Sequence, residues 1–413
     1  MYIVKRNDKL NKLIFLIVCF NCNLNETEIK LMLKIKRNPA ALLVLILPAL
    51  LAVSCGKKEI NHKTLLVYGT DAKITSYDLE KNKVNWTYKN AADTESRLNK
   101  FTVDDSVLYV PFQLGSVTAL NVNTGKLIWD HKIKPIFDMF QPATDKDPNI
   151  LLMGQSAITD KDHVFIASTN KMFYGLNKKD GKEAWSSTLK YTESFDPPVI
   201  IGDYVYLANT TELIKFDTKT GMQMWSVNSE NDVPLYSTLL TDGNRVFMAD
   251  EKQKLYAVED PYHVAWKFTM PEDQYDIDQN MVLDDGVIYF CPYGGNNGTP
   301  VYAVNAKDGK KIWEKKLDKL YIKTLKVFDG QIFCLSDEKF LILDSKDGKV
   351  LFDTALTEKP ISNIIEKDNN TIIYLSANGL VSFDKMKKKF DVNKKVKFPV
   401  SASSQSFTWI KAL

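Results

Sequence analysis

The chain has 413 residues, of which 45% are hydrophobic and 11% are aromatic, and its formal net charge is +3. This composition is typical of a folded globular protein and excludes an intrinsically disordered chain. The small charge and the scattered lysines also argue against a protein that binds nucleic acid. One large repeat domain accounts for most of the length.

Residues 32–54 have the features of a secretory signal. Three basic residues come first, and an apolar run, AALLVLILPALLA, ends in small residues before Cys55. The run is too short to span a membrane comfortably. Because such a signal normally lies at the start of a protein, we expect translation to begin at Met32 and residues 1–31 to be an upstream extension. The alternative is a single long leader.

The segment LLAVSCGK resembles a bacterial lipobox, the motif in which a cysteine is diacylated after cleavage. The resemblance implies that Cys55 carries lipid, and an ordinary signal peptide with an incidental cysteine is the alternative. Because each buried CH₂ group contributes about 0.8 kcal/mol, several acyl chains would hold the protein on a membrane. Gly56 rather than Asp follows the cysteine, which in enterobacterial sorting implies the outer membrane. Residues 55–63 would then form a polar tether.

Copies of one unit occupy residues 64–413. The clearest copy is Val205–Val227, VYLANTTELIKFDTKTGMQMWSV, whose alternating apolar residues predict strand, turn, strand, tight turn and strand. Most copies have an aromatic residue after the tight turn, and successive copies are mostly about 40 residues apart, as in a propeller. The residues that open the tight turns are Asp78, Asn121, Asn177, Asp217, Glu259, Asn305, Asp344 and Asp384.

Every copy after the first has a further segment before these three strands, which gives four strands. We therefore predict an all-β fold, an eight-bladed β-propeller of four-stranded blades. Seven blades are the alternative, because the last copy is short and has Phe390 in place of tryptophan. The first copy lacks its inner strand. Ser406–Ala412 is the candidate for that strand, so the two chain ends would share a blade and close the ring.

Six of the seven tryptophans end a repeat. Burying a tryptophan removes roughly 150–250 Å² from water, which contributes about 4–6 kcal/mol. We therefore expect these residues to pack between neighbouring blades rather than to stack on a ligand. Cys291 and Cys334 lie in equivalent strands of adjacent repeats, on opposite sides of their sheets. We expect two separate buried thiols and no disulfide.

Two insertions interrupt the repeats, and in propellers the loops carry specificity. The first follows Trp129 and contains apolar residues that we expect to contact a partner protein, with folding back over the rim as the alternative. These residues are Ile136, Phe137, Met139 and Phe140. The second insertion, PYGGNNGTP, offers side chains that could stack on a glycan and hydrogen-bond to it. These are Tyr293, Asn296 and Asn297.

The segments ALNVNTGKLIW (119–129) and AVNAKDGKKIW (303–313) resemble the repeats of quinoprotein-type propellers. With the lipoprotein signal and eight copies, the chain resembles the propeller subunit of the outer-membrane barrel assembly machinery. The resemblance implies a lipid-anchored scaffold on the periplasmic face of the outer membrane, with an orientation toward the cell surface left open. It also implies a protein partner, bound through loops or an exposed outer strand, and neither enzymatic activity nor a cofactor.

Two other functions remain open. Quinone-dependent alcohol or sugar dehydrogenases use the same repeats, but they also need a calcium site of Glu, Asn and Asp beside a catalytic Asp. The adjacent cysteines that many of them contain are missing here. A glycan-binding surface lipoprotein is the other alternative. No pair of the four histidines has the spacing of metal ligands, so we expect no metal site.

Overall fold

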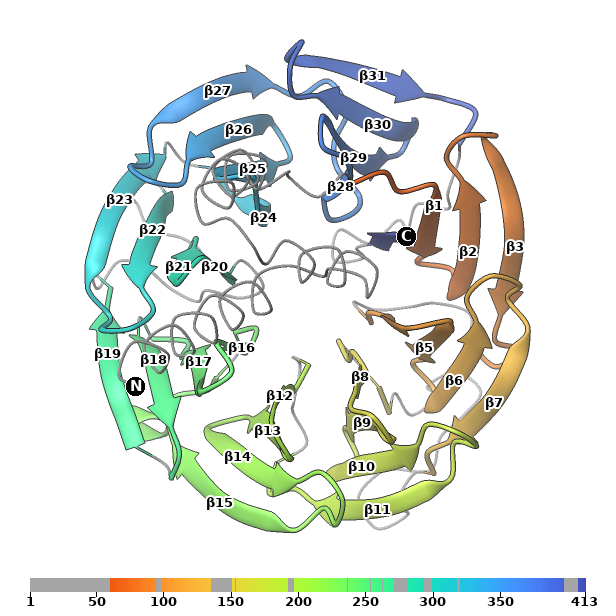
Figure 1. Cartoon of the computed structure of the whole chain (residues 1–413), viewed down its shortest axis with the longest axis vertical. Coiled ribbons are helices and arrows are strands. Elements are labelled where there is room, and N and C mark those ends of the chain that lie inside the picture. Colours follow the sequence, from red (N-terminus) through yellow and green to blue (C-terminus); the bar gives the residue numbers. More distant parts are fainter. Residues whose placement is uncertain are drawn as a thin grey trace, which may run out of the picture. The chain divides into compact units, whose positions relative to one another are not determined.

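The computed structural model describes residues 60–413 except 94–98, 135–150, 153, 192–196, 236, 253, 262, 271–280, 293–298, 318–319 and 397–407. In this part of the chain, eight antiparallel four-stranded sheets form the blades of a ring (Figure 1). The predicted eight-bladed β-propeller is confirmed, and the seven-bladed alternative is wrong. The described residues contain one short 3₁₀ turn, η1 (Glu230–Asp232). They contain no helix that is long and apolar enough to cross a membrane.

We number the blades 1 to 8 in chain order. Blade 1 combines the last strand of the chain with the first three, and each later blade uses four consecutive strands. The strands of blades 1 to 4 are β32 (Trp409–Ala412), β1 (Thr64–Tyr68), β2 (Lys73–Asp78), β3 (Lys83–Lys89); β4 (Thr102–Asp104), β5 (Val107–Pro111), β6 (Ser116–Asn121), β7 (Leu127–Lys132); β8 (Ile158–Thr159), β9 (His163–Ser168), β10 (Met172–Asn177), β11 (Glu183–Thr188); β12 (Val199–Ile201), β13 (Tyr204–Asn209), β14 (Glu212–Asp217) and β15 (Gln223–Asn228).

The other four blades follow in the same order, from the inner strand to the outer strand of each blade (Figure 1). Their strands are β16 (Leu240–Thr241), β17 (Arg245–Ala249), β18 (Lys254–Glu259), β19 (His263–Thr269); β20 (Met281–Asp284), β21 (Val287–Phe290), β22 (Thr299–Asn305), β23 (Lys311–Leu317); β24 (Ile322–Phe328), β25 (Gln331–Ser336), β26 (Lys339–Asp344), β27 (Val350–Ala355); β28 (Ile365–Asp368), β29 (Thr371–Ser376), β30 (Gly379–Asp384) and β31 (Lys389–Asn393).

The two middle strands of each blade form the core. In β13 and β14 nearly every side chain is buried, because neighbouring blades cover both faces of the sheet. Apolar residues, many of them β-branched or aromatic, therefore run almost without interruption through these strands. The outer strand β15 instead alternates exposed and half-buried side chains. One core layer between blades 4 and 5 contains Tyr206, Leu213, Val246 and Met248.

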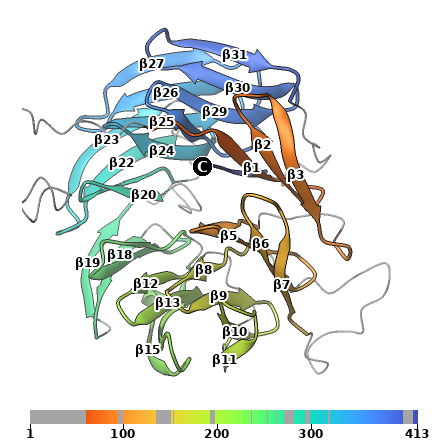
Figure 2. The same cartoon turned by 45° about the vertical axis from the view of Figure 1, so that its right-hand side comes forward.

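The two ends of the described chain meet in blade 1. β32 pairs antiparallel with β1, with Tyr68 opposite Trp409. The backbone N–H of Leu413 also donates a hydrogen bond to the carbonyl oxygen of Thr64, at 2.9 Å. The predicted closure of the ring by the C-terminal strand is therefore confirmed. Figure 2 shows blade 8 beside blade 1, and we call the junction of these two blades the closing seam.

Cys291 and Cys334 are both free and buried, as predicted. Their opposite orientations in adjacent blades place both thiols in a single core cluster between blades 6 and 7. They therefore share one layer instead of lying in two separate layers. Burial raises the pKa of Cys334 to about 12, so this thiol stays protonated near neutral pH.

Candidate functional site

At five of the eight seams, a tryptophan on the outer strand of one blade is hydrogen-bonded to the backbone of the next blade. The indole N–H donates a hydrogen bond to the backbone carbonyl oxygen of the residue after the turn-opening Asp or Asn in the next blade. The five pairs and their N···O distances are Trp86–Val122 (3.1 Å), Trp129–Lys178 (2.8 Å), Trp185–Thr218 (2.9 Å), Trp266–Ala306 (3.1 Å) and Trp313–Ser345 (2.9 Å). These contacts confirm the prediction that the recurring tryptophans pack between blades.

A glycine in the receiving turn allows the indole to approach closely. A Cβ atom at Gly221 would lie 2.4 Å from the ring of Trp185, and φ at this glycine is +69°. At Gly181 the Cβ would lie 2.5 Å from Trp129. The positive φ that the turn requires is one reason for these glycines, because glycine adopts it without strain. Their second role, contact with the preceding blade, is visible only when the blades are placed side by side.

The seam between blades 4 and 5 also has a tryptophan, but there a side-chain carboxylate accepts the hydrogen bond in place of the backbone carbonyl. The indole N–H of Trp225 donates to Oδ1 of Asp260 at 2.9 Å, and Nζ of Lys215 lies 2.5 Å from Oδ2. The side chain of Lys215 is only 4% exposed, and its ammonium group lies 3.7 Å from the ring centre of Tyr204. The hydrogen bond from Lys215 holds the pKa of Asp260 below its usual range.

The closing seam has no aromatic residue at the corresponding position, and this corrects our interpretation of Phe390. The pairing of β30 with β31 lacks the β-bulge found in the other seven blades, so Phe390 lies opposite Phe383. Asp391 therefore takes the position of the tryptophan. Because side chains alternate along a strand, Phe390 points to the other face. There it packs against Phe340 and Phe383 in the core between blades 7 and 8.

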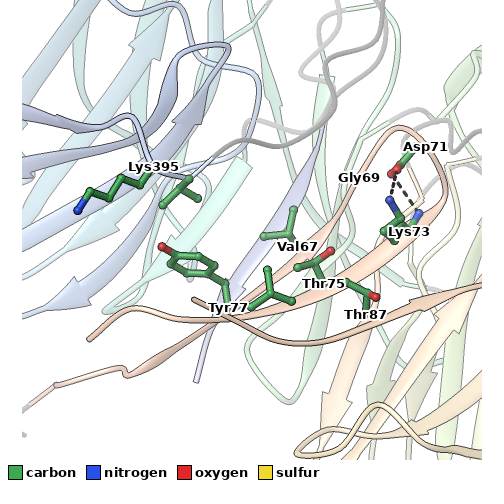
Figure 3. Close-up of a pocket in the computed structure, with 10 residues that line it drawn as sticks. Val67, Gly69, Asp71, Lys73, Thr75, Tyr77, Thr87 and Lys395 are labelled. Atoms are coloured by element: carbon green, nitrogen blue, oxygen red, sulfur yellow. Dashed lines mark hydrogen bonds and ion pairs between the residues drawn. The ribbon is translucent and has the colours of Figure 1, made fainter. Parts of the chain in front are cut away.

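A cavity of about 240 Å³ lies at this closing seam (Figure 3). Tyr77, Thr75 and Val67 of blade 1 line it, and Lys395 and Val396 contribute from the segment after β31. Figure 3 shows the side chain of Tyr77 between the rest of the blade 1 lining and Lys395. The two blades of the closing seam thus leave space between them.

Several outer strands expose large apolar side chains near their first residues. Side chains of this kind contribute a contact area for another protein without any catalytic chemistry. They belong to blades 1, 2, 4 and 6, and their exposed fractions are Val84 52%, Leu127 52%, Ile128 47%, Met224 43% and Ile312 47%. The rim of the ring is therefore a candidate interaction surface that sequence periodicity did not reveal, because it treats the outer strands like the inner ones.

The site residues predicted from the sequence lie outside the described residues. This holds for the lipidation candidate Cys55, for the partner-loop candidates and for the glycan-loop candidates Tyr293, Asn296 and Asn297. The partner-loop candidates are Ile136, Phe137, Met139 and Phe140. In the part of the chain that the structure does describe, no three His, Cys, Asp or Glu residues are grouped as ligands of a metal ion.

Comparison with known proteins supports a propeller built from quinoprotein-type repeats. A family model described as "Outer membrane protein assembly factor BamB" matches residues 52–137, 115–260, 170–295 and 263–385. The factor of that name from Shewanella oneidensis is 25% identical over 207 residues, 47% of this chain and 48% of the relative. The match thus spans about half the length of that relative.

Two solved structures share the architecture. BamB from Moraxella catarrhalis has a TM-score of 0.59 at 16% identity, covering 79% of this chain and 95% of that one. A quinohemoprotein alcohol dehydrogenase from Pseudomonas putida HK5 has the same TM-score at 11% identity, covering 77% and 69%. At such identities these likenesses show the fold alone. The ring and its repeats define a quinoprotein-like β-propeller.

The extent of the family match allows a narrower assignment than the fold does. The matched segments together reach from residue 52 to residue 385 and so include nearly the whole ring. This chain belongs to the family of the outer membrane protein assembly factor BamB.

Proposed function

We propose that this protein is a non-enzymatic interaction scaffold in the assembly of outer-membrane proteins. The observation that carries the proposal is the family-model match across residues 52–385. The family and the Shewanella relative are both named for outer-membrane protein assembly. The exposed apolar side chains on the outer strands support a role in protein contacts. The tryptophans that would otherwise suggest a ligand site are used to join the blades.

Affinity purification from detergent-solubilised membranes tests the scaffold function. We expect the tagged full-length protein to recover a subunit of the barrel assembly machinery. Recovery of polysaccharide or transport proteins in its place would contradict the proposal. Turnover of an alcohol in the presence of pyrroloquinoline quinone, Ca²⁺ and a dye acceptor would contradict the non-enzymatic part.

We propose that the partner contact lies on the insertion after blade 2, at Ile136, Phe137, Met139 and Phe140. Apolar side chains in a surface insertion are suited to anchoring a partner. The double variant Phe137→Asp/Phe140→Asp should lose the recovered partner, and Thr144→Asp in the same insertion is the matched control. Equal recovery by both variants would move the contact elsewhere on the ring.

We propose that lipid on Cys55 holds the protein on the periplasmic face of the outer membrane. The lipobox-like segment before this residue supports the assignment. Cys55→Ser should release the protein into the soluble fraction and remove the acyl mass from the N-terminal peptide. Cys291→Ser, a change at a buried thiol, should remain in the membrane fraction. A Cys55→Ser protein that sediments with membranes like wild type would show that lipid is not the anchor.

A further inference from the structure

The cavity at the closing seam occupies a position that aromatic side chains fill at the seam between blades 1 and 2. Trp86 and Tyr88 of β3 join the core cluster that contains Leu120 of blade 2. The residues at the same two positions of β31 are Asp391 and Asn393. Their short polar side chains leave the space unfilled, because neither has a ring to reach across the seam.

The blade 1 residues that line the cavity also correspond to residues of blade 2 at the seam between blades 1 and 2. Tyr77 of blade 1 corresponds to Leu120 of blade 2, since each directly precedes the residue that opens its turn. Val84 also lines the cavity and is 52% exposed, so the space is reachable from solvent. An aromatic side chain from outside the ring can therefore occupy a place that the chain's own tryptophans occupy elsewhere.

The segment around β31, which includes the cavity-lining Lys395, is rich in lysine. Residues 384–395 contain six lysines and two carboxylates, Asp384 and Asp391. Lys385 is paired with Glu366 at 2.7 Å, and Lys387 is paired with Asp384 at 3.0 Å. Lys388 donates to the backbone carbonyl oxygen of Leu351 in blade 7, at 3.2 Å. The three other lysines are exposed, and within the described residues they form no ion pair. These are Lys389, Lys394 and Lys395.

The strand between these lysines is also free to accept another strand. β31 is the outer strand of blade 8, and among the described strands its backbone pairs with β30 alone. Backbone groups on such an edge pair with an added strand, and pockets for alternate side chains then supply specificity. Every blade has an outer edge, but an adjoining cavity and a lysine-rich segment have been identified at this one.

We propose that the closing seam is a docking site for an acidic, extended segment of a partner protein. The segment pairs with β31, places one aromatic side chain in the cavity and sets its carboxylates against Lys394 and Lys395. The exposed lysines favour an acidic partner by charge complementarity. The aromatic contacts at the other seams indicate that the side chain in the cavity is aromatic. This inference names the partner chemistry for the proposed scaffold function and rests on it.

A labelled model peptide tests the proposal. Its single tryptophan is flanked by valines and then by glutamates, and its binding to the full-length protein in detergent is followed by fluorescence anisotropy. We expect saturable binding that weakens as salt is added. A peptide with serine in place of the tryptophan should bind at least about tenfold more weakly. Equal binding of the two peptides would overturn the role of the cavity.

Two variants locate the binding. Asp391→Trp, combined with Asn82→Gly so that the receiving turn admits the ring, fills the cavity from within. Lys394→Glu/Lys395→Glu reverses the local charge, and each of these two variants should weaken peptide binding at least about tenfold. Lys315→Glu/Lys316→Glu, a pair on the outer strand of blade 6, is the matched control and should bind like wild type. The charge variant keeps the proposal falsifiable if Asp391→Trp/Asn82→Gly does not fold. Wild-type affinity in both seam variants would overturn the proposal.

Two further outcomes separate this inference from its alternatives. If vesicles containing anionic phospholipid bind in a Lys394- and Lys395-dependent manner and the peptide does not, the seam is a membrane contact and the proposal is wrong. If the protein recovers a barrel assembly subunit from membranes but does not bind the peptide, only the docking site is wrong. Failure of both measurements would remove the scaffold function as well.

Discussion

The seam between blades 3 and 4 and the closing seam hold neighbouring blades together by different contacts. At the first, Trp185 of β11 is hydrogen-bonded to the turn of blade 4 and lies against Gly221. At the closing seam Asp391 stands in place of the tryptophan. There the side-chain amide of Asn393 donates to Oδ1 of Asn82, at 2.6 Å.

The difference shows where the closing seam obtains its stability. Blades 3 and 4 are consecutive in the chain, so an interlocking side chain and a receiving turn join them directly. Blades 8 and 1 are instead joined by β32, which pairs with β1 and places Ile410 in the core cluster between these blades. No indole links the outer strands of blades 8 and 1, and the outer part of the seam is therefore open.

The largest effect should come from removing a tryptophan at one of the seams where an indole joins two blades. Trp185 is 8% exposed, and its ring centre lies 5.6 Å from that of Phe173. Trp185→Ala should lower the free energy of unfolding by about 3–5 kcal/mol, because it deletes buried surface and leaves a cavity. Urea denaturation measures the change. Lys182→Ala, at a side chain 82% exposed, is the control, and equal stability of both variants would contradict the packing role.

The glycine that receives this indole should have the next largest effect. At Gly221→Ala, a left-handed backbone and a Cβ 2.4 Å from Trp185 act together, so we expect a loss of about 2–3 kcal/mol. Gly202 also has a positive φ, +59°, but its Cβ would meet nothing within 4 Å. Gly202→Ala should therefore cost only about 1 kcal/mol. If the two variants melt at the same temperature, contact with the indole does not explain the glycine.

The seams that a tryptophan joins could be predicted from the sequence far better than the closing seam. Alternating apolar residues and a repeated turn predicted the four-stranded blades, and the recurrence of tryptophan predicted packing between them, because each feature is local and periodic. The position of Phe390 could not be predicted in the same way. The loss of one bulge shifts its register and turns the side chain to the other face, and residue type does not report a bulge.

The candidate site was less predictable than the fold. Its lining joins Tyr77 near the start of the ring with Lys395 near its end, so no local pattern connects them. The lysines around β31 were visible in the sequence, but a run of lysines is usually a solvated surface. The lysine run adjoins a cavity because residue 391 is Asp and not an aromatic residue, and this is visible only in the structure.

Filling the closing seam should produce a smaller effect of opposite sign. Asn82 stands where the turns that receive an indole on their backbone at five other seams have glycine, so we combine Asp391→Trp with Asn82→Gly to admit the ring. The pair would place an indole against Tyr77 and Val84, and we expect a gain in stability of about 1 kcal/mol from the apolar surface that it covers. Ser226→Trp, at an exposed position of β15, should leave the stability unchanged. A destabilised Asp391→Trp/Asn82→Gly protein would mean that the cavity cannot accept an indole from its own strand.

The smallest effect should come from the seam that uses a carboxylate. The folded pKa of Asp260 is lowered by Lys215 and then by Trp225. Its ionised form therefore stabilises the protein at pH values above the unfolded pKa, which is about 3.9, and this contribution is lost as the pH falls through the folded pKa. The side chain is 50% exposed, so solvent screening limits the contribution to about 0.2–1 kcal/mol.

Asp260→Asn removes this charge and tests the dependence on pH. The variant should be slightly less stable than wild type in urea at neutral pH, and the difference should shrink as the pH falls below about 4. Asp203→Asn is the control, because the carboxylate of Asp203 is 73% exposed and lies 3.5 Å from Lys219. If the difference between Asp260→Asn and wild type stays constant with pH, the indole of Trp225 is held by geometry alone. The carboxylate would then accept the indole hydrogen bond as a backbone carbonyl does at five other seams, and its charge would contribute nothing to stability.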